Sequence, residues 1–168
     1  MLNQLEVLTA RVGGCSDLVD FCLRSRKQLL ITYYHLVGIK PNKESVTTLD
    51  ENALDNFCQG LVDYLSTGHF TIYERFIEEM EGSEQLARAA IIYPSLQANT
   101  ELIMQVYDSH LECAIDHDNY LEFQTALSSV GEALEARFTL EDRFIQLALE
   151  KNGVNLAAAN DNALARPA

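Results

Sequence analysis

Residues 123–148 read FQTALSSVGEALEARFTLEDRFIQLA, and their apolar side chains recur at the three- and four-residue spacing of an α-helix. This apolar stripe consists of Phe123, Leu127, Val130, Leu134, Phe138, Ile145 and Ala148. Asp118 or Asn119 can cap the helix, with Glu122 placed to complete a capping box. The stretch therefore predicts one long amphipathic helix that buries the stripe.

The same spacing recurs through most of the chain before this stretch. Ser16 and Asp17 offer an N-cap for a helix that is predicted to end near Gly38, with Pro41 just beyond it as a helix-ending signal. A second helix is predicted to begin near Asp50, which can cap it, and to stop at Gly68. These two segments predict a pair of amphipathic helices joined by a polar loop.

Glycine and proline divide the next part of the chain. A shorter helix is predicted over 69–80 and is ended by Gly82, after which Ser83 can cap the following segment. Pro94 predicts a break or a fresh start within that segment, since proline lacks the backbone N–H that a helix interior needs. A further amphipathic helix is predicted over 95–116.

The fold class follows from these elements. No segment sustains the alternating pattern of a β-strand, so the chain is predicted to be all-α. Four long helices with short links favour an antiparallel four-helix bundle, with short accessory helices near 2–12 and 69–81. We expect one helical domain over 1–151. Residues 152–168 are rich in Ala and Asn without an apolar stripe, and we expect a disordered tail there.

The charge of the chain bears on its partners. Twelve basic and 25 acidic residues give a formal net charge of −13. Direct nucleic-acid binding takes a clustered basic surface, and the nearest cluster, Arg24, Arg26 and Lys27, is small. The acidity can serve solubility alone, or it can match a basic partner such as the nucleic-acid-binding surface of another protein. The net charge alone does not decide between these two interpretations.

The sequence gives no sign of a membrane or secretory address. No apolar stretch approaches the roughly 20 residues of a membrane span, and the N-terminus lacks the pattern of a signal peptide. We therefore expect a cytoplasmic protein. The spacing of the four cysteines is unlike a disulfide framework, so structural cysteines are expected at Cys15, Cys22, Cys58 and Cys113.

The motifs of common enzyme and metal sites are missing from the sequence. It contains no Glu-x-x-His pair, no His-Glu-x-x-His motif, no nucleophile elbow and no glycine-rich phosphate loop. His110 and His117, with Asp116 and Asp118, could form a metal or acid–base site, but a core histidine at 110 and capping residues at 116–119 are the favoured interpretation. We expect no enzyme, metal or cofactor.

Acidic and aromatic residues gather between residues 63 and 74. The paired acids Glu78–Glu79 and Glu141–Asp142 are expected to face solvent, but Asp63 and Glu74 flank three aromatic residues, Tyr64, Phe70 and Tyr73. Large rings beside charges are typical of an interface hot spot, and equally of a helical core. The pattern alone does not decide between the two.

Several runs of sequence resemble the regulator of sigma D family, Rsd/AlgQ. They are residues 1–5 (MLNQL), 33–41 (YYHLVGIKP), 68–75 (GHFTIYER), 116–123 (DHDNYLEF) and 131–138 (GEALEARF). The resemblance implies an anti-sigma factor that binds the C-terminal, promoter −35-reading domain of the primary sigma subunit. Such binding would block use of that subunit by RNA polymerase and favour alternative sigma factors.

The resemblance also implies residues and partners. It implies Asp63 as a charge partner for a basic sigma side chain and Phe70 as the apolar anchor of the interface. The surrounding residues would be Leu65, Ser66, His69 and Glu74. The family is further associated with the phosphocarrier protein of the sugar phosphotransferase system and with (p)ppGpp synthetase/hydrolase enzymes. A signalling adaptor for those proteins is therefore the alternative function.

Overall fold

The computed structural model describes residues 1–38, 48–111 and 120–153, and within these ranges it contains helices and no strand. The expectation of an all-α protein is confirmed. The elements are α1 (Leu2–Val12), α2 (Asp17–Gly38), α3 (Thr48–Thr67), the π-helix η1 (Gly68–Tyr73), α4 (Glu74–Glu79), α5 (Glu84–Val106), the π-helix η2 (Tyr107–Leu111) and α6 (Tyr120–Lys151).

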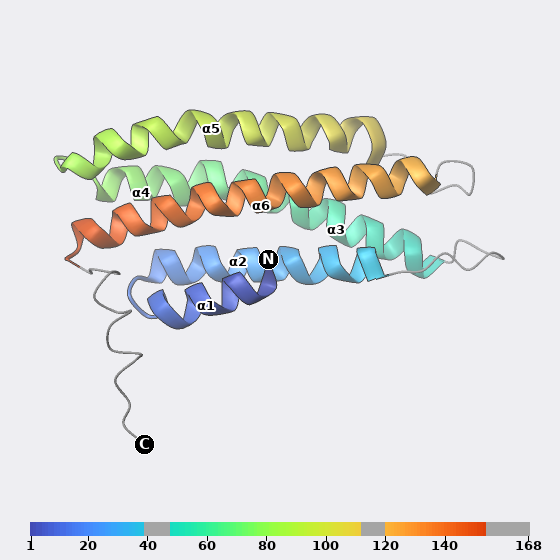
Figure 1. Cartoon of the computed structure of the whole chain (residues 1–168), viewed down its shortest axis with the longest axis horizontal. Coiled ribbons are helices and arrows are strands. Elements are labelled where there is room, and N and C mark those ends of the chain that lie inside the picture. The colour runs from blue at the N-terminus through green and yellow to red at the C-terminus, as the bar shows by residue number, and fades with distance from the viewer. Residues whose placement is uncertain (39–47, 112–119, 154–168) are drawn as a thin grey trace, which may run out of the picture.

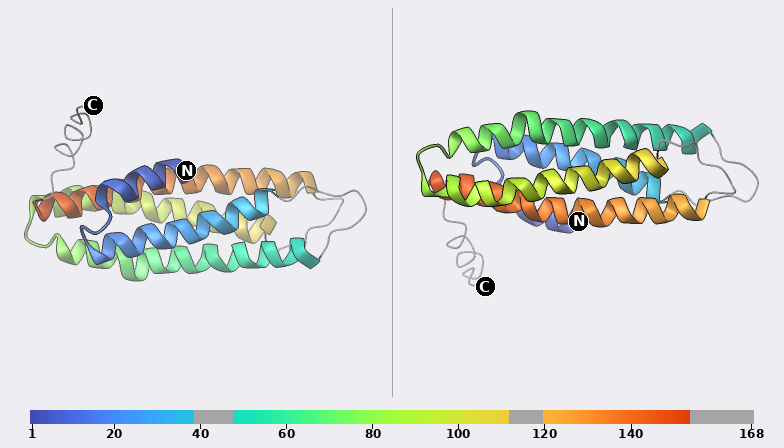
Figure 2. Two further views of the ribbon diagram at one scale, coloured as in Figure 1. Left: turned by 90° about the horizontal axis from the view of Figure 1, so that it is seen from below. Right: turned by 90° about the horizontal axis from the view of Figure 1, so that it is seen from above.

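The long helical segments lie lengthwise against one another. Figure 1 shows α2, the continuous α3–η1–α4, α5 and α6 along the longest axis, with successive segments running in opposite directions. Helix α2 packs beside α3, and α5 packs beside α6. The short helix α1 lies on the outside, against α2 (Figure 2). Each long segment thereby turns one face toward a common interior.

The core forms where the apolar stripes meet. All seven stripe residues of 123–148 are buried in α6, so the prediction of one long amphipathic helix that buries this stripe is confirmed. Helix α2 begins at Asp17 and ends at Gly38, as its cap and stop signals predict. Burying one large apolar side chain contributes roughly 1.5–3 kcal/mol, which lets stripes of this length specify the packing of each helix.

The predicted helix stop at Gly68 is wrong. The chain stays helical from Thr48 to Glu79 through η1, and the preceding Thr67 has φ −60° and ψ −39°. Gly68 is buried, and a Cβ atom there would lie 3.1 Å from Arg137 Nη2 and from Tyr73 Oη. A side chain at this position would crowd Arg137 and Tyr73, and the glycine does not end its own helix.

The predicted break at Pro94 is also wrong, because α5 runs through it from Glu84 to Val106. A proline inside a helix costs about 3 kcal/mol. Ala89 and Leu96 on either side of it are fully buried in α5, which packs along α6. We attribute the continuity of α5 to this packing. Helix α4 ends at Glu79, and Gly82 lies in the turn that follows it, with φ +72°.

Some predictions fall outside the described residues. These are the loop containing Pro41, the thiol Cys113, the capping and acid–base candidates at 116–119, and the tail from residue 154. Helix α6 ends at Lys151. Among the described helices, none is long and apolar enough to cross a membrane.

Candidate functional site

Of the three aromatic residues in the segment 63–74, two lie in the core and one lies on the surface. Tyr64 and Tyr73 are buried, whereas 76% of the Phe70 side chain is exposed. Phe70 lies in the π-helix η1, a type of segment that occurs frequently at functional sites. The interpretation as core is therefore right for the two tyrosines, whereas the phenylalanine lies on the surface.

Glu141 of α6 holds the two tyrosines in place. The hydroxyl of Tyr64 donates a hydrogen bond to Glu141 Oε2, and the hydroxyl of Tyr73 donates one to Oε1, both at 2.5 Å. Arg26 Nη2 and Arg137 Nε approach the same carboxylate at 3.0 and 3.1 Å. The prediction that Glu141 faces solvent is wrong, because charged and hydroxyl donors from three other helical segments make its burial possible.

The electrostatics of this cluster favour an ionised Glu141. Burial by itself would raise the pKa of Glu141, but Arg26 and Arg137 beside it, with the two tyrosine hydrogen bonds, hold that pKa below its ordinary value. Burial and the Glu141 carboxylate raise the pKa of both Tyr64 and Tyr73. Both phenols therefore stay protonated and keep donating to the carboxylate.

Arg137 extends the cluster toward η1. Its Nη1 donates to Thr100 Oγ1 at 2.8 Å and to Asn99 Oδ1 at 3.3 Å. The same threonine hydroxyl lies 2.7 Å from Nε2 of His69. The polar cluster consequently ties η1 to α5 and α6 on its inner side, through His69 and Tyr73, while Phe70 projects outward.

The structure brings most of the predicted site residues to one surface. Asp63, Ser66, Phe70 and Glu74 are exposed and follow one another at steps of three and four residues, the spacing at which helical side chains are neighbours. His69 is half-buried beside them. Leu65 is buried in the core, so it supports this surface from beneath.

Sequence reasoning missed the contribution of α2. A groove of about 300 Å³ lies between α2 and α3, and its walls include Phe21, Gln28 and Thr32 of α2 facing Asp63 and Thr67 of α3. The side chain of Phe21 is 40% exposed. The sequence did contain a signal for this wall of the groove, because Phe21 is an apolar residue that lies outside the buried stripe of its helix.

The exposure of His110 and the burial of Arg26 correct two further expectations from the sequence. His110 is exposed, so the expectation of a core histidine is wrong. Arg26 is buried against Glu141 and adds nothing to a basic surface with Arg24 and Lys27. Over the described ranges, no three His, Cys, Asp or Glu side chains are grouped to hold a metal ion.

The buried thiol of Cys22 fits the structural role expected for it. Burial raises its pKa to about 12, and a thiol that stays protonated is unreactive. Cys15 is exposed, so it does not share that role.

Comparison with known proteins points to one family. The family model described as regulator of RNA polymerase sigma(70) subunit, Rsd/AlgQ, matches residues 1–149. The regulator of sigma D of Enterobacter sp. (strain 638) is 65% identical over 168 residues, which is 100% of both chains. That of Escherichia fergusonii is 63% identical over 158 residues, or 94% of this chain and 100% of the relative. That of Escherichia coli (strain K12 / DH10B) is 65% identical over 150 residues, or 89% and 95%.

Proposed function

Because the chain belongs to the Rsd/AlgQ family of regulators of the RNA polymerase sigma(70) subunit, we propose that it is an anti-sigma factor for the C-terminal domain of the primary sigma subunit. Binding would cover the surfaces with which that domain contacts RNA polymerase and the promoter −35 element. The polymerase would then be available to alternative sigma factors. The protein would act in the cytoplasm, as a binding protein and not as an enzyme.

The exposure of Phe70 is the observation that carries the proposal. A phenylalanine with 76% of its side chain in water gains hydrophobic stabilisation only when a partner covers it. The inner side of η1 is fixed by His69 and Tyr73, so Phe70 is presented without a large loss of freedom on binding. A large ring held in this way suits an interface anchor.

The acids around Phe70 suit a basic partner. Asp63 and Glu74 are exposed on the same side of α3–η1–α4, and Asp63 also lines the groove against α2. A domain that reads DNA carries basic side chains, which Asp63 can pair with. The net charge of −13 would raise the association rate with such a domain and disfavour acidic competitors.

We assign a role to each residue of this surface. Phe70 is the apolar anchor, Asp63 is the charge partner, and Ser66, His69 and Glu74 form the polar surround. Leu65 is the core residue that supports them. The groove between α2 and α3 would receive a further part of the partner beside Phe21. The framework would be an antiparallel four-helix bundle over residues 1–151.

Calorimetric titration of the full chain with the isolated C-terminal sigma domain, at two salt concentrations, tests the proposal. Phe70→Ala should weaken binding by on the order of 2 kcal/mol, roughly 30-fold. Asp63→Ala should weaken it less and reduce its dependence on salt. The matched controls are Ile91→Ala on α5, whose side chain is 77% exposed, and Asp55→Ala, an exposed acid on α3.

The outcomes separate function from site. Saturable binding that falls with salt and with both test variants, but not with the controls, supports function and site together. Binding that neither test variant changes would keep the function and overturn the site. No binding at micromolar concentration would overturn the anti-sigma proposal and direct the search to the phosphocarrier protein and the (p)ppGpp synthetase/hydrolase.

A further inference from the structure

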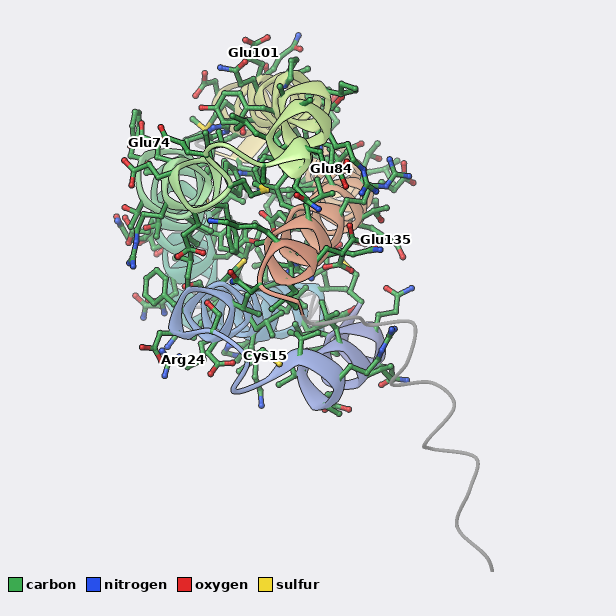
Figure 3. The ribbon with its side chains drawn as sticks, turned by 90° about the vertical axis from the view of Figure 1, so that its left-hand side faces the viewer. Cys15, Arg24, Glu74, Glu84, Glu101 and Glu135 are labelled. Carbon is green, nitrogen blue, oxygen red and sulfur yellow. The ribbon has the colours of Figure 1, made fainter. Side chains whose placement is uncertain are left out.

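A cleft of about 560 Å³ lies between α1 and α6, on a different part of the molecule from the surface around Phe70. It forms because α1 packs on α2 and covers that side of the molecule only partly. Figure 3 places Glu135, at the wall of this cleft, and Glu74, beside the proposed sigma surface, on opposite sides of the molecule. The volume is within the roughly 300–1,000 Å³ of small-molecule sites.

The middle of the cleft is apolar. Leu8 of α1 faces Phe138 and Ile145 of α6 across it. On the α1 side the lining residues recur from Gln4 to Arg11 at helical spacing, so at 1.5 Å per residue this wall is about 10 Å long. The cleft therefore has room for an aromatic or short aliphatic group between two helices.

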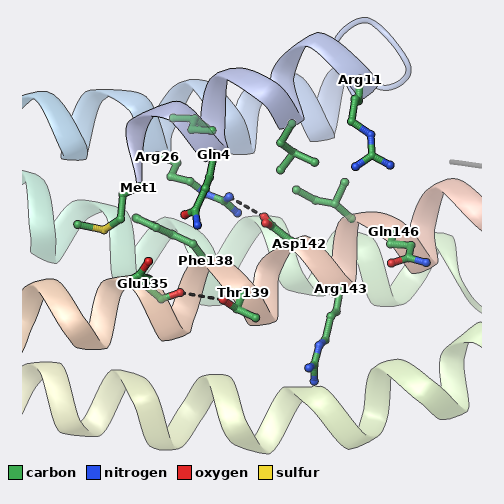
Figure 4. Close-up of a pocket in the computed structure, with 13 residues that line it drawn as sticks. Met1, Gln4, Arg11, Arg26, Glu135, Phe138, Thr139, Asp142, Arg143 and Gln146 are labelled. Carbon is green, nitrogen blue, oxygen red and sulfur yellow. Dashed lines mark hydrogen bonds and ion pairs between the residues drawn. The ribbon is translucent and has the colours of Figure 1, made fainter. Parts of the chain in front are cut away.

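The charge of the lining is opposite to that of the whole protein. The residues that line the cleft include three arginines, Arg11, Arg26 and Arg143, and two acids, Glu135 and Asp142. One of these carboxylates is already paired, since Asp142 Oδ1 lies 2.6 Å from Arg26 Nη1 (Figure 4). Arg26 pairs with Glu141 as well, so its charge is balanced within the protein, and the arginines that could meet the acidic group of a ligand are Arg11 and Arg143.

Arg26 supplies an independent observation. Its side chain is 2% exposed, its two terminal nitrogens pair with Glu141 and Asp142, and its guanidinium carbon lies 4.7 Å from the centroid of the Phe138 ring. Within the described part of the chain, no acceptor is bonded to the Arg26 Nε–H. A buried donor without an acceptor is unfavourable and calls for an explanation. An anion that reached this N–H from the cleft would supply the missing acceptor.

We propose that the α1–α6 cleft binds a small organic anion. Its apolar body would lie against Leu8, above the buried side chains of Phe138 and Ile145. Its acidic group, a carboxylate, sulfonate or phosphate, would be held by the guanidinium groups of the wall. Figure 4 shows Arg11 reaching from α1 over one end of the cleft and Arg26 lying between α1 and α6. This site is independent of the sigma-binding proposal.

Fluorescence titration with 8-anilinonaphthalene-1-sulfonate tests the site, because this probe joins two aromatic groups to an anion. The neutral analogue N-phenyl-1-naphthylamine, which lacks the sulfonate, separates anion recognition from apolar binding. Near-UV circular dichroism and the melting temperature of each protein exclude binding to a loosened fold. Raising the salt from 0.05 to 0.5 M gives a second measure of the charge contribution.

We expect one saturable site that binds the anionic probe on the order of tenfold more tightly than the neutral one, the ratio that a single charge-assisted contact gives. Arg11→Gln should weaken the anionic probe by about tenfold and leave the neutral probe unchanged. Leu8→Glu, which places a carboxylate in the cleft, should weaken both probes. Arg88→Gln is the matched control, because Arg88 is an exposed arginine paired with Glu150 outside the cleft.

Three results would overturn the proposal. The first is the lack of saturable binding of the anionic probe up to millimolar concentration. The second is equal affinity for the charged and neutral probes. The third is binding that Arg11→Gln and Leu8→Glu reduce no more than Arg88→Gln does, while all variants keep their native circular dichroism.

Discussion

Tyr73 and Glu141 lie 68 residues apart in the sequence and are joined by a 2.5 Å hydrogen bond in which the phenol donates to the carboxylate. The bond connects η1, which carries Phe70, to the middle of α6. Since Arg26, Tyr64 and Arg137 converge on the same carboxylate, Glu141 links three other helical segments to α6 and pairs with Arg137 within it. The stability of the fold and the placement of the candidate interface therefore share one residue.

Replacing Glu141 with Gln should destabilise the protein strongly. Removal of one partner of a buried ion pair leaves the other charge uncompensated, and we expect a loss of about 3–5 kcal/mol in the free energy of unfolding. Urea denaturation followed by circular dichroism measures it. Glu135→Gln, an exposed acid on the same helix, should change the free energy by no more than about 0.5 kcal/mol. A loss below about 1 kcal/mol at Glu141 would mean that the network contributes little.

The contribution of Glu141 should depend on pH with a defined sign. The pKa of Glu141 in the folded protein is held below its ordinary value of 4.5 by Arg26 and Arg137, against the effect of burial. Its stabilising effect is then fully present above pH 4.5 and is lost as the pH falls through the lower folded-state pKa. The difference in unfolding free energy between wild type and Glu141→Gln should be flat at neutral pH and narrow in acid. A difference that widens below pH 4.5 would contradict the assignment.

Gly131 of α6 should not tolerate a side chain. A Cβ atom there would overlap the Tyr33 hydroxyl oxygen and lie 2.9 Å from Tyr33 Cζ, while that hydroxyl donates to the Leu127 carbonyl at 3.2 Å. Gly131→Ala should therefore cost about 1–3 kcal/mol, although alanine is the better helix former. The double variant with Tyr33→Leu should recover part of the loss, and Ser129→Ala on the exposed face should be near neutral. An additive double variant would show that the two side chains do not clash.

The described cysteines should differ in reactivity. Cys15 is exposed, whereas burial raises the pKa of the Cys22 thiol to about 12 and removes it from solvent. Brief treatment of the native protein with iodoacetamide should modify Cys15 and spare Cys22, and denaturant should expose both, as peptide mass spectrometry can measure. The Cys15→Ser variant shows how much of the native signal belongs to that site. Rapid native modification of Cys22 would indicate that α2 opens readily from the core.

Local signals predicted the helices well. Apolar residues at steps of three and four identified the buried face of α6, and Asp17 and Gly38 marked the ends of α2, because periodicity and capping depend on residues close in sequence. The predictions at Gly68 and Pro94 were wrong because they, too, rested only on residues close in sequence. Their local preferences against a helix are outweighed by packing between segments that are distant in the chain.

The candidate site was predictable only in part. The exposed row Asp63, Ser66, Phe70 and Glu74 came from a resemblance of sequence, and no local pattern separated the exposed Phe70 from the buried Tyr64 and Tyr73. All three are aromatic residues on one helical stretch. The two tyrosines carry a hydroxyl that can satisfy a buried carboxylate, and that carboxylate lies on another helix.

The sequence by itself determined that this protein is helical, where α2 begins and ends, and which face of α6 is buried, because these properties follow from the periodicity and capping of residues near one another. Only the tertiary structure decided that Glu141 is buried, that Phe70 is exposed, and that a cleft with arginines in its lining lies between α1 and α6. Each of these depends on which helices meet. A charge can be buried only where side chains from distant segments supply its hydrogen bonds, and spacing along one helix does not reveal them.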